Sequence, residues 1–551
     1  MLPVFYKGGI MAATKLFYGG HIYTVDAKRS WAEAVAIESN RIIYVGDLAG
    51  AASLCDESTE RIDLEGKMLL PGFIDGHCHP ILAAHYLCGV YLEIEYSVQD
   101  CLDAIRAYVE ENPEEETYFG IGYAEWIFDE TGPKKELLDE ICPDKPMMIL
   151  GSSAHEAWVN SKALELAGIT KDTPDPIPGF HYFHRDGSGE PTGHLVETGP
   201  QIMITDKVNF FKADTVRRMI ELNSAGYASM GVTTTCDMGC PEFGQDFYFR
   251  TIPEMIEAGT YMQRFFGCGR MVADKSEIEL ILGRLQEQKD ACDTDFFNIH
   301  FLKIINDGTL ETRSAALSEP YNEDGSMVQP LLTREEIARL GVRAAKAGLD
   351  INVHAIGDEA ISGTLAMAKA VREAGFDDCR IVNSHCDYVK DEELGLFGKY
   401  DVIANTTCVW HYGNPDMEAV IGDRQNRTFR LKSMIDGGCR MGQGSDFPVD
   451  EFGREPLKGI EMGCTRQLFD HPELPVLKPY EEKLSVDDGI ASYTINNAYQ
   501  MHAEDRLGSI EEGKLADLVI LEKNLFDVPL SEIHKVRVCE TILDGTTVFR
   551  A

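Results

Sequence analysis

Two histidines near the start of the chain have the spacing of a metal site. Residues 70–79, LPGFIDGHCH, form an apolar run with a Pro-Gly turn that ends in His77 and His79. Side chains at positions i and i+2 of a strand point to the same face, so both imidazoles can reach one ion. A His-x-His pair alone is a weak signal, and the apolar lead-in strengthens it. Cys78 lies between the two candidate ligands.

This segment resembles the first-strand signature of the amidohydrolase superfamily. The resemblance implies a basic ligand on a later strand, two separated histidines and an aspartate on the last strand, in that order. The chain offers these residue types in that order: Lys303, His354, His385 and Asp446. Each lies at or near the carboxyl end of an expected strand, where barrel enzymes build their active sites. Taken one at a time, Lys303 could be a salt-bridged lysine, the two histidines could be core residues and Asp446 could cap a helix. Taken together, the four residues indicate a metal centre.

Longer motifs resemble the YtcJ-like branch of the superfamily, which includes N-substituted formamide deformylases. The lysine strand, KIINDGTLETRSAAL, covers residues 303–317. Other stretches similar to branch or superfamily motifs are residues 155–161, 191–195, 444–449 and 508–519. Phe447 stands where tryptophan is usual, and residues 121–126 match the branch only loosely. These departures concern the substrate more than the metal site.

The resemblance implies a binuclear hydrolase. Lys303 would be carbamylated and would bridge two divalent ions, because a carbamate is an anionic oxygen ligand whereas an ammonium repels cations. The ligands divide into His77, His79 and Asp446 for one ion and His354 and His385 for the other. Zinc suits this set, and manganese, iron and cobalt are also compatible. A metal-bridged hydroxide would attack the C–N bond of an amide, formamide or cyclic amide, with Asp446 as general acid/base.

Four residues in branch-like motifs are candidate substrate contacts: His155, Trp158, Asn160 and Arg313. An arginine at the mouth of the site could clamp a carboxylate. The competing interpretations are core packing for Trp158 and an internal ion pair for Arg313. The substrate itself is not readable from the sequence.

Three other functions stay open. A mononuclear deaminase of the same superfamily generally lacks the strand lysine and uses a glutamate near the strand-5 histidine, whereas this chain has Lys303 and places Asp358 after His354. A decarboxylase or hydratase could use the same metals. A non-catalytic scaffold should have lost ligands, and none is missing. The number of bound ions would distinguish a mononuclear deaminase and a non-catalytic scaffold from a binuclear hydrolase.

The elements that position these residues alternate between strands and helices. Strands are expected at residues 231–235, 298–305, 350–354, 380–385, 402–405 and 441–444. Helices are expected at residues 334–347 and 359–374. Repeated strand-helix alternation predicts an α/β fold with a parallel sheet, here a TIM-type (β/α)8 barrel.

Both ends of the chain are rich in short strands and turns. We expect residues 1–68 and 499–551 to form a small β-sandwich, and residues 69–498 to form the hydrolase barrel. Residues 91–200 fit the alternation badly, and we expect an insertion after barrel strand 1 that caps the barrel mouth. Met1 or Met11 could be the natural start.

Composition excludes several partners. The chain of 551 residues carries a formal charge of −40, which repels nucleic acids and anionic membranes. No apolar run approaches the roughly 20 residues that cross a bilayer. Its 15 cysteines are scattered, as expected for buried free thiols rather than a disulfide scaffold. We expect a cytoplasmic protein with a small-molecule substrate; a homodimer is one possible assembly.

Overall fold

The computed structural model describes residues 12–93, 96–129, 131–152, 155–176, 178, 181–239, 246–268, 271–292, 294–322, 325–449 and 452–551. The choice between Met1 and Met11 lies outside these residues. The chain forms two compact units: unit 1 comprises Met1–His79, Ser224–Gly239 and Ile252–Ala551, and unit 2 comprises Pro80–Asn223 and Cys240–Thr251. Within the described ranges, no helix is both long and apolar enough to cross a membrane.

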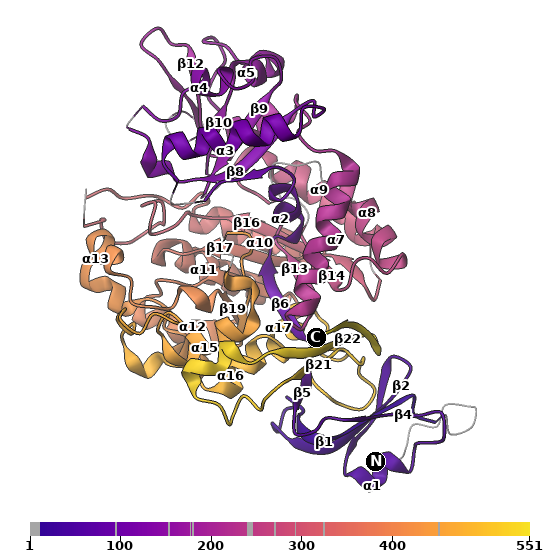
Figure 1. Cartoon of the computed structure of the whole chain (residues 1–551). Helices are drawn as coiled ribbons and strands as arrows, with labels where there is room; N and C mark the ends of the chain where they lie inside the picture. Colours follow the sequence, from indigo (N-terminus) through magenta and orange to yellow (C-terminus); the bar gives the residue numbers. More distant parts are fainter. Residues whose placement is uncertain are drawn as a thin grey trace. The chain divides into compact units, whose positions relative to one another are not determined.

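Unit 1 contains two parallel sheets, ordered β15–β14–β13–β6 and β16–β17–β18–β19–β20 (Figure 1). Their strands are β6 (Phe73–Cys78), β13 (Val232–Asp237), β14 (Arg264–Gly267), β15 (Phe297–Ile299), β16 (Phe301–Ile305), β17 (Asp350–Ala355), β18 (Ile381–His385), β19 (Val402–Thr406) and β20 (Met441–Gln443). Nearly every position is buried, which explains why these strands read as apolar runs rather than as alternating patterns. Five of the six strands expected from the sequence agree with observed ones to within two residues, and the sixth, residues 298–305, is divided into β15 and β16.

Helices connect the parallel strands, as such connections require. The expected helices are α10 (Arg334–Lys346), which opens with a capping box between Thr333 and Glu336, and α11 (Asp358–Glu373). The other α-helices of unit 1 are α1 (Leu48–Ala52), α9 (Ile278–Ala291), α12 (Leu394–Lys399), α13 (Pro415–Ile421), α14 (Leu431–Asp436), α15 (Pro456–Thr465), α16 (Val486–Ser492) and α17 (Ile495–Gln500). Two more, α7 (Ala213–Ser229) and α8 (Asp246–Glu257), are divided between the two units. The α/β alternation predicted from the sequence is therefore confirmed.

Both ends of the chain enter one further sheet of unit 1, ordered β23–β22–β21–β5–β1–β2–β3 with β4 beside β1. Its strands are β1 (Lys15–Tyr23), β2 (Trp31–Glu38), β3 (Arg41–Gly46), β4 (Glu60–Asp63), β5 (Met68–Pro71), β21 (Leu518–Leu521), β22 (Val538–Leu543) and β23 (Thr546–Arg550). β21 runs antiparallel to β5, which leads directly into β6. The C-terminal strands thus anchor the strand that carries His77.

A buried arginine joins the C-terminal strands to a parallel sheet. Arg264 on β14 is 1% exposed, and its guanidinium makes two hydrogen bonds to Asp517, of 2.7 and 3.0 Å. It also donates to Asp544 at 2.8 Å and lies over the ring of Phe296. Fork-shaped pairing of this kind satisfies a charge that would otherwise be costly to bury.

Unit 2 has its own sheet, ordered β11–β12–β10–β9–β8–β7. Its elements are β7 (Val90–Tyr91), β8 (Tyr118–Tyr123), β9 (Met147–Gly151), β10 (Glu156–Val159), β11 (Tyr182–Arg185) and β12 (Pro191–Val196), with helices α2 (Pro80–Tyr86), α3 (Val98–Glu111), α4 (Lys135–Asp139), α5 (Ser161–Ala167) and α6 (Thr198–Thr205).

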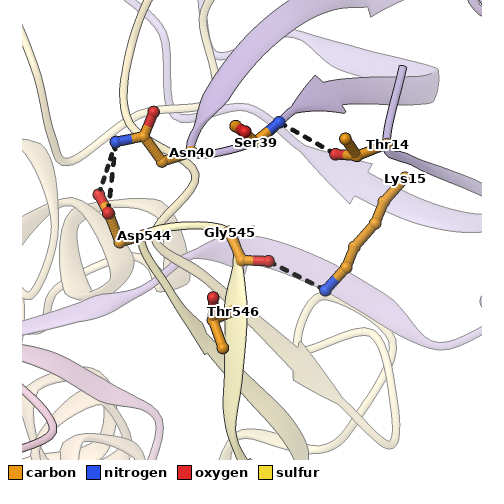
Figure 2. Close-up of a pocket in the computed structure, with 7 residues that line it drawn as sticks. All are labelled: Thr14, Lys15, Ser39, Asn40, Asp544, Gly545 and Thr546. Atoms are coloured by element: carbon orange, nitrogen blue, oxygen red, sulfur yellow. Dashed lines mark hydrogen bonds between the residues drawn. The ribbon is translucent and has the colours of Figure 1, made fainter. Parts of the chain in front are cut away.

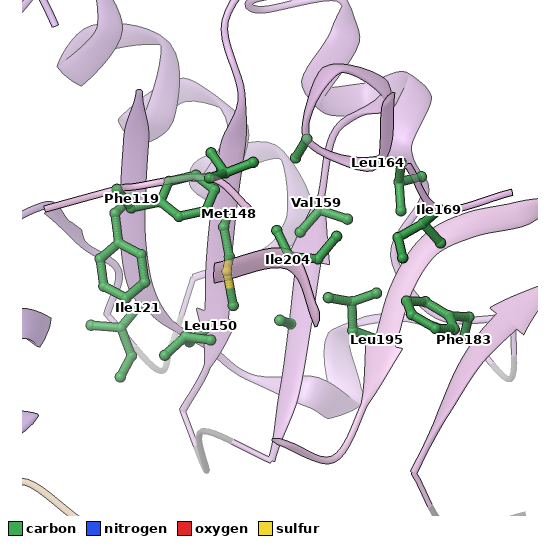
Figure 3. Close-up of a cluster of buried hydrophobic side chains, with 14 of the residues drawn as sticks. Phe119, Ile121, Met148, Leu150, Val159, Leu164, Ile169, Phe183, Leu195 and Ile204 are labelled. Atoms are coloured by element: carbon green, nitrogen blue, oxygen red, sulfur yellow. The ribbon is translucent and has the colours of Figure 1, made fainter. Parts of the chain in front are cut away.

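The unit 2 sheet is apolar on both faces. Phe119 and Met148 lie in one buried cluster (Figure 3), whereas their neighbours Tyr118 and Met147 lie in another. Because side chains alternate along a strand, this division places one cluster on each face of the sheet. Residues 91–200 therefore form part of a separate α/β unit, and its role as a cap over a barrel mouth stays a prediction.

Replacing Arg264 with Met should lower the free energy of unfolding by about 3–5 kcal/mol, because Asp517 would remain buried without its partner. The measurement is equilibrium unfolding in urea. The matched control is Arg343→Met, which breaks an ion pair with Glu279 between side chains that are 51% and 77% exposed, and should change stability by at most about 1 kcal/mol. Equal effects of the two substitutions would contradict a structural role for the buried pair.

Candidate metal centre

His77 and His79 leave the carboxyl end of β6 with their Nε2 atoms directed at one point. His79 Nδ1 donates to the carbonyl of Gly239 at 2.8 Å, so its Nε2 carries the lone pair in the neutral ring. His77 Nδ1 lies 2.8 Å from the hydroxyl of Ser384, whose proton goes to Asn352 Oδ1. His77 Nδ1 must therefore be the donor in that contact, which leaves its Nε2 free to bind a metal.

Asp446 completes the group. Its Oδ1 lies 3.3 Å from His77 Nε2 and 3.2 Å from His79 Nε2. Its backbone N–H donates to the carbonyl of His77, and the N–H of His79 donates to the carbonyl of Phe447, each at 2.8 Å. Asp75 holds the same loop by accepting hydrogen bonds from the N–H and hydroxyl of Ser445. These contacts fix the loop after β20 against the end of β6.

The spacing fits a tetrahedral ion. Ligand atoms about 2.0–2.1 Å from zinc, at tetrahedral angles, lie about 3.3–3.4 Å apart, and the observed separations are 3.2 and 3.3 Å. Burial, with a smaller effect from Lys303, lowers the pKa of His77 to about 3, so this ring is neutral and able to coordinate. Burial acts to lower the pKa of His79, but the contact with Asp446 outweighs it and the pKa is raised. A metal at this site would therefore compete with a proton on His79.

Lys303 reaches the same point from β16. The side chain is buried, its Nζ donates to Asn352 Oδ1 at 3.0 Å, and Nζ lies 3.3 Å from His77 Nε2. Burial lowers its pKa to about 8. A neutral amine is the form that can react with CO2, so this environment is compatible with the carbamylation that the family resemblance implies.

His385 and His354 stand on the other side of His77. The ring of His385, at the end of β18, lies 5.1 Å from that of His77 and 4.4 Å from that of His354. Ligand atoms of His77, His385 and Asp446 lie within 4.8 Å of one another. His385 Nδ1 is buried without a hydrogen-bond partner in the described part of the chain. His354 is half-buried, and its Nε2 lies 3.4 Å from the carbonyl of Gly308. The structure thus brings all six predicted ligands together. The Nδ1 of His385, which has no hydrogen-bond partner in the described part of the chain, would suit a second ion.

Two residues of this network were not predicted. Asn352 Oδ1 accepts from both Lys303 and Ser384, and Ser384 in turn positions His77. Both are polar residues inside apolar strands, two and one positions before His354 and His385. A buried polar side chain on the same strand face as a candidate ligand is the signal that would have found Asn352.

Cys78 is not part of the centre. Its side chain is fully buried, and its Sγ contacts the carbonyl of Cys236 at 3.6 Å. Burial, aided by the nearby Asp75, raises the pKa of the thiol well above its usual range. As the alternate residue between two histidines on one strand, it faces away from them. It is a buried free thiol.

Two of the predicted substrate contacts are interior residues of unit 2. Asn160 is 0% exposed: its Oδ1 accepts from the N–H groups of Met147 and Ala163, and its Nδ2 donates to two carbonyls. It is the N-cap of α5. Trp158 is also 0% exposed, and its Nε1 donates to the carbonyl of Lys134. Packing and capping thus occupy both side chains, which argues against substrate contact, and their contact with a substrate stays an untested prediction.

The other two candidates are more accessible. His155 has a side chain that is 45% exposed, and its Nδ1 lies 2.8 Å from Glu197 Oε2. Arg313 is half-buried in a turn after β16, in the left-handed backbone region. Their contact with a substrate stays a prediction.

An open pocket elsewhere in unit 1 carries none of these ligands (Figure 2). It is lined by Thr14, Lys15, Ser39, Asn40, Asp544, Gly545 and Thr546. Asn40 Nδ2 donates to Asp544 Oδ1 at 3.1 Å, and Lys15 Nζ donates to the carbonyl of Gly545 at 2.9 Å. These bonds join the first and last strands of the chain, so the depression marks a structural junction.

Comparison with known proteins agrees with this geometry. The model of the Amidohydrolase family matches residues 60–549. The chain is similar to the exoenzymes regulatory protein AepA of Pectobacterium carotovorum subsp. carotovorum, with 30% identity over 72% of this chain and 86% of that protein. It is also similar to the N-substituted formamide deformylase of Arthrobacter pascens, with 26% identity over 96% and 97% of the two chains. The matches confirm the resemblance seen in the sequence motifs.

A solved structure has the same fold. An uncharacterized metal-dependent hydrolase from Pyrococcus horikoshii superposes with a TM-score of 0.76 at 23% identity, covering 94% of this chain and 99% of that one. At this identity the likeness concerns the fold alone.

Replacing Ser384 with Ala should weaken metal binding by about 10–100-fold, because His77 would lose the partner that fixes its tautomer and orientation. Affinity is measured by titration with zinc against a competing chelator. The control is Ser362→Ala, which removes a buried hydroxyl on α11 that donates to Glu393 instead. Equal affinities of the two variants would contradict the positioning role of Ser384.

Replacing Asn160 with Ala should lower the free energy of unfolding by about 1–3 kcal/mol, because two N–H groups would lose their acceptor. The comparison variant is His155→Ala, which removes a partly exposed side chain and should change stability by about 0.5 kcal/mol or less. Urea unfolding checks both. An Asn160→Ala protein of unchanged stability but impaired turnover would restore the substrate role that the structure argues against.

Proposed function

The chain belongs to the amidohydrolase family of metal-dependent hydrolases, and from this premise we propose that it hydrolyses a carbon–nitrogen bond in an amide, formamide or cyclic amide. The observation that carries the proposal is the convergence of two imidazole Nε2 atoms and one carboxylate oxygen at 3.2–3.3 Å beside a buried lysine. The similar Arthrobacter protein is named a formamide deformylase, which favours formamides among these bonds.

We propose that the two parallel sheets close into one (β/α)8 barrel. Only His300 separates β15 from β16, so the two act as one continuous strand and the nine strands of the sheets reduce to eight. Backbone bonds support closure at the junctions: His300 donates to Gly267, Val272 to Lys303, and Asp446 to His77. In a barrel, the carboxyl ends of the strands share one face, where the candidate ligands lie.

The residues fit two divalent ions. His77, His79 and Asp446 would hold one and His354 and His385 the other, with carbamylated Lys303 shared between them. Nitrogen and oxygen donors in this arrangement suit zinc. When bound, the ions would lower the pKa of water towards 7 and polarise the substrate carbonyl.

Asp446 is the residue placed to move a proton. Its Oδ1 faces the two imidazoles. Burial raises the pKa of this carboxyl, but the contacts with His77 and His79 outweigh that effect and hold the pKa well below its usual range, so it is ionised. Asp446 would take the proton of the attacking water and return it to the leaving nitrogen. Water is added, the C–N bond breaks, and an acid and an amine are released.

The environment of Asp358 argues against the deaminase alternative. Its two carboxylate oxygens accept from the N–H and the hydroxyl of Ser318, and the side chain is buried at the start of α11. This carboxylate is committed to a loop contact and is not offered to a substrate. The ligand set therefore favours the binuclear hydrolase.

Wild-type protein should contain about two metal ions per chain by elemental analysis when it is purified without chelator and with bicarbonate present. Lys303→Ala should retain at most one ion and lose at least about 100-fold in formamide hydrolysis. Short carboxylates such as acetate should restore part of both, because they supply the missing anionic ligand. The control is Lys346→Ala, which removes an exposed lysine of α10.

Each other outcome has a definite meaning. Full metal content and turnover in Lys303→Ala would exclude the carbamate. One ion in the wild type would favour a mononuclear deaminase, and none after reconstitution would favour a non-catalytic scaffold.

A further inference from the structure

We propose that Asp387 forms a cation-binding subsite beside the metal centre, so that the preferred substrate carries an ammonium or similar cationic group away from the bond that is cut. The inference deepens the proposed hydrolytic function and rests on it.

Asp387 is a buried carboxylate without a partner. It is 6% exposed, and its Oδ1 has no hydrogen-bond partner in the part of the chain that the structure describes. Buried carboxylates are normally paired with a cation or with several N–H groups. Asp307, in the loop after β16, shows the usual case, since it accepts from the N–H groups of Ala316, Ile356 and Gly357.

The surroundings of Asp387 disfavour a second negative charge. Burial, and after it the negative charges of Glu311, Asp307 and Asp446, raise the pKa of its carboxyl well above the usual range. A cation bound at Asp387 would oppose both effects and favour the ionised carboxylate. The three acidic residues come from the turn after β16 and from the loop after β20. Glu311 is exposed, whereas Asp387 is buried. A cation would therefore be attracted at the rim and held at Asp387, and a carboxylate would be repelled.

The backbone is held in an unfavourable conformation to place this side chain. His385 and Cys386, the two preceding residues, have φ angles of 79° and 58°. Consecutive left-handed conformations in residues other than glycine are strained, and such strain clusters at functional sites. Asn383 supports the turn by donating to the carbonyl of Ala355, and Phe429 N–H donates to the carbonyl of Asp387.

Asp387 follows the candidate ligand His385 by two residues in the chain. Within the described residues, it is not part of the group His77, His385 and Asp446, whose donor atoms lie within 4.8 Å of one another. Trp410 stacks on the ring of His385 with an interplanar angle of 19° and is partly exposed. An aromatic ring at the centre could also contribute to the binding of an organic cation.

This assignment opposes the expectation that Arg313 clamps a carboxylate. Arg313 lies in the same turn as Glu311. Binding governed by Arg313 would favour a substrate with a carboxylate at its far end, whereas binding governed by Asp387 would favour one with an ammonium group. A matched series of substrates separates them.

The test uses metal-loaded protein and three formamides that bear an ammonium, a methyl or a carboxylate at the end of the same four-carbon chain. Wild-type kcat/KM should be at least about tenfold higher for the ammonium substrate than for the methyl one, and lowest for the carboxylate. Asp387→Asn keeps the shape and removes the charge, and should reduce the ammonium preference to about twofold or less with unchanged metal content. Asp378→Asn, an exposed residue before β18, should keep the wild-type preference.

Calorimetric binding of pentylammonium separates failure of this inference from failure of the proposed function. Binding at least about tenfold weaker in Asp387→Asn supports the subsite even if no formamide is cleaved, which would reject the hydrolase proposal alone. Equal cleavage of all three formamides by the wild type would reject the subsite and keep the hydrolase.

If Asp387→Asn does not fold, wild-type binding of pentylammonium over pentanol decides the question, and equal affinities overturn the inference. Loss of metal in a folded Asp387→Asn protein would overturn it in favour of a ligand role.

Discussion

The hydroxyl of Ser384 has one proton to donate, and the metal centre depends on where it goes. It goes to Asn352, so His77 must donate its own Nδ1 proton to Ser384 and keep a lone pair on Nε2. Asn352 also accepts from Lys303. One amide oxygen thus couples strands β16, β17 and β18 to β6 and sets the chemical state of two candidate ligands together.

Holding the ligands in place requires backbone conformations that the chain would not otherwise adopt. His385, Cys386 and Asp446 all have positive φ angles, and each such residue costs about 1–3 kcal/mol. The surroundings offset this with buried polar contacts. Asp75, whose pKa burial raises to about 6, accepts three hydrogen bonds from Ser445 and His77 around the Asp446 loop. At the carboxyl ends of the strands, buried polar contacts therefore offset the free-energy cost of the backbone conformations that position the ligands.

The sequence was informative where periodicity and residue type act locally. Apolar runs located β17, β18 and β19 because buried parallel strands have few alternatives, and the histidines on β17 and β18 were recognisable as candidate ligands. Motif likeness alone was ambiguous for Asn160, since a branch motif does not distinguish a substrate contact from a helix cap. The cap was readable, because Asn160 directly precedes the helical run that begins at Ser161. Asp387 was not predictable, because its lack of a partner is a property of tertiary packing.

Strand register explains why separate weak signals combine into one centre. Lys303 pairs with Asn352, His354 with Ser384, and Ala355 with His385 across β16, β17 and β18. A slip of one residue in any of these pairs would turn a ligand to the opposite face. Every candidate ligand lies in unit 1, so its register and its terminal strands are sufficient to assemble the centre.

The acidic residues of the chain act on cations in two ways, through the overall charge at long range and through single carboxylates at short range. A net charge of −40 raises the concentration of cations near the surface, but salt screens this field over about 10 Å and it cannot distinguish one cation from another. Selection requires a charge inside the screening distance that water and protein leave uncompensated. The proposed role of Asp387 rests on such a charge, because the side chain is buried and its Oδ1 has no hydrogen-bond partner among the described residues. The overall charge would gather cations, and the local geometry would decide which of them stays.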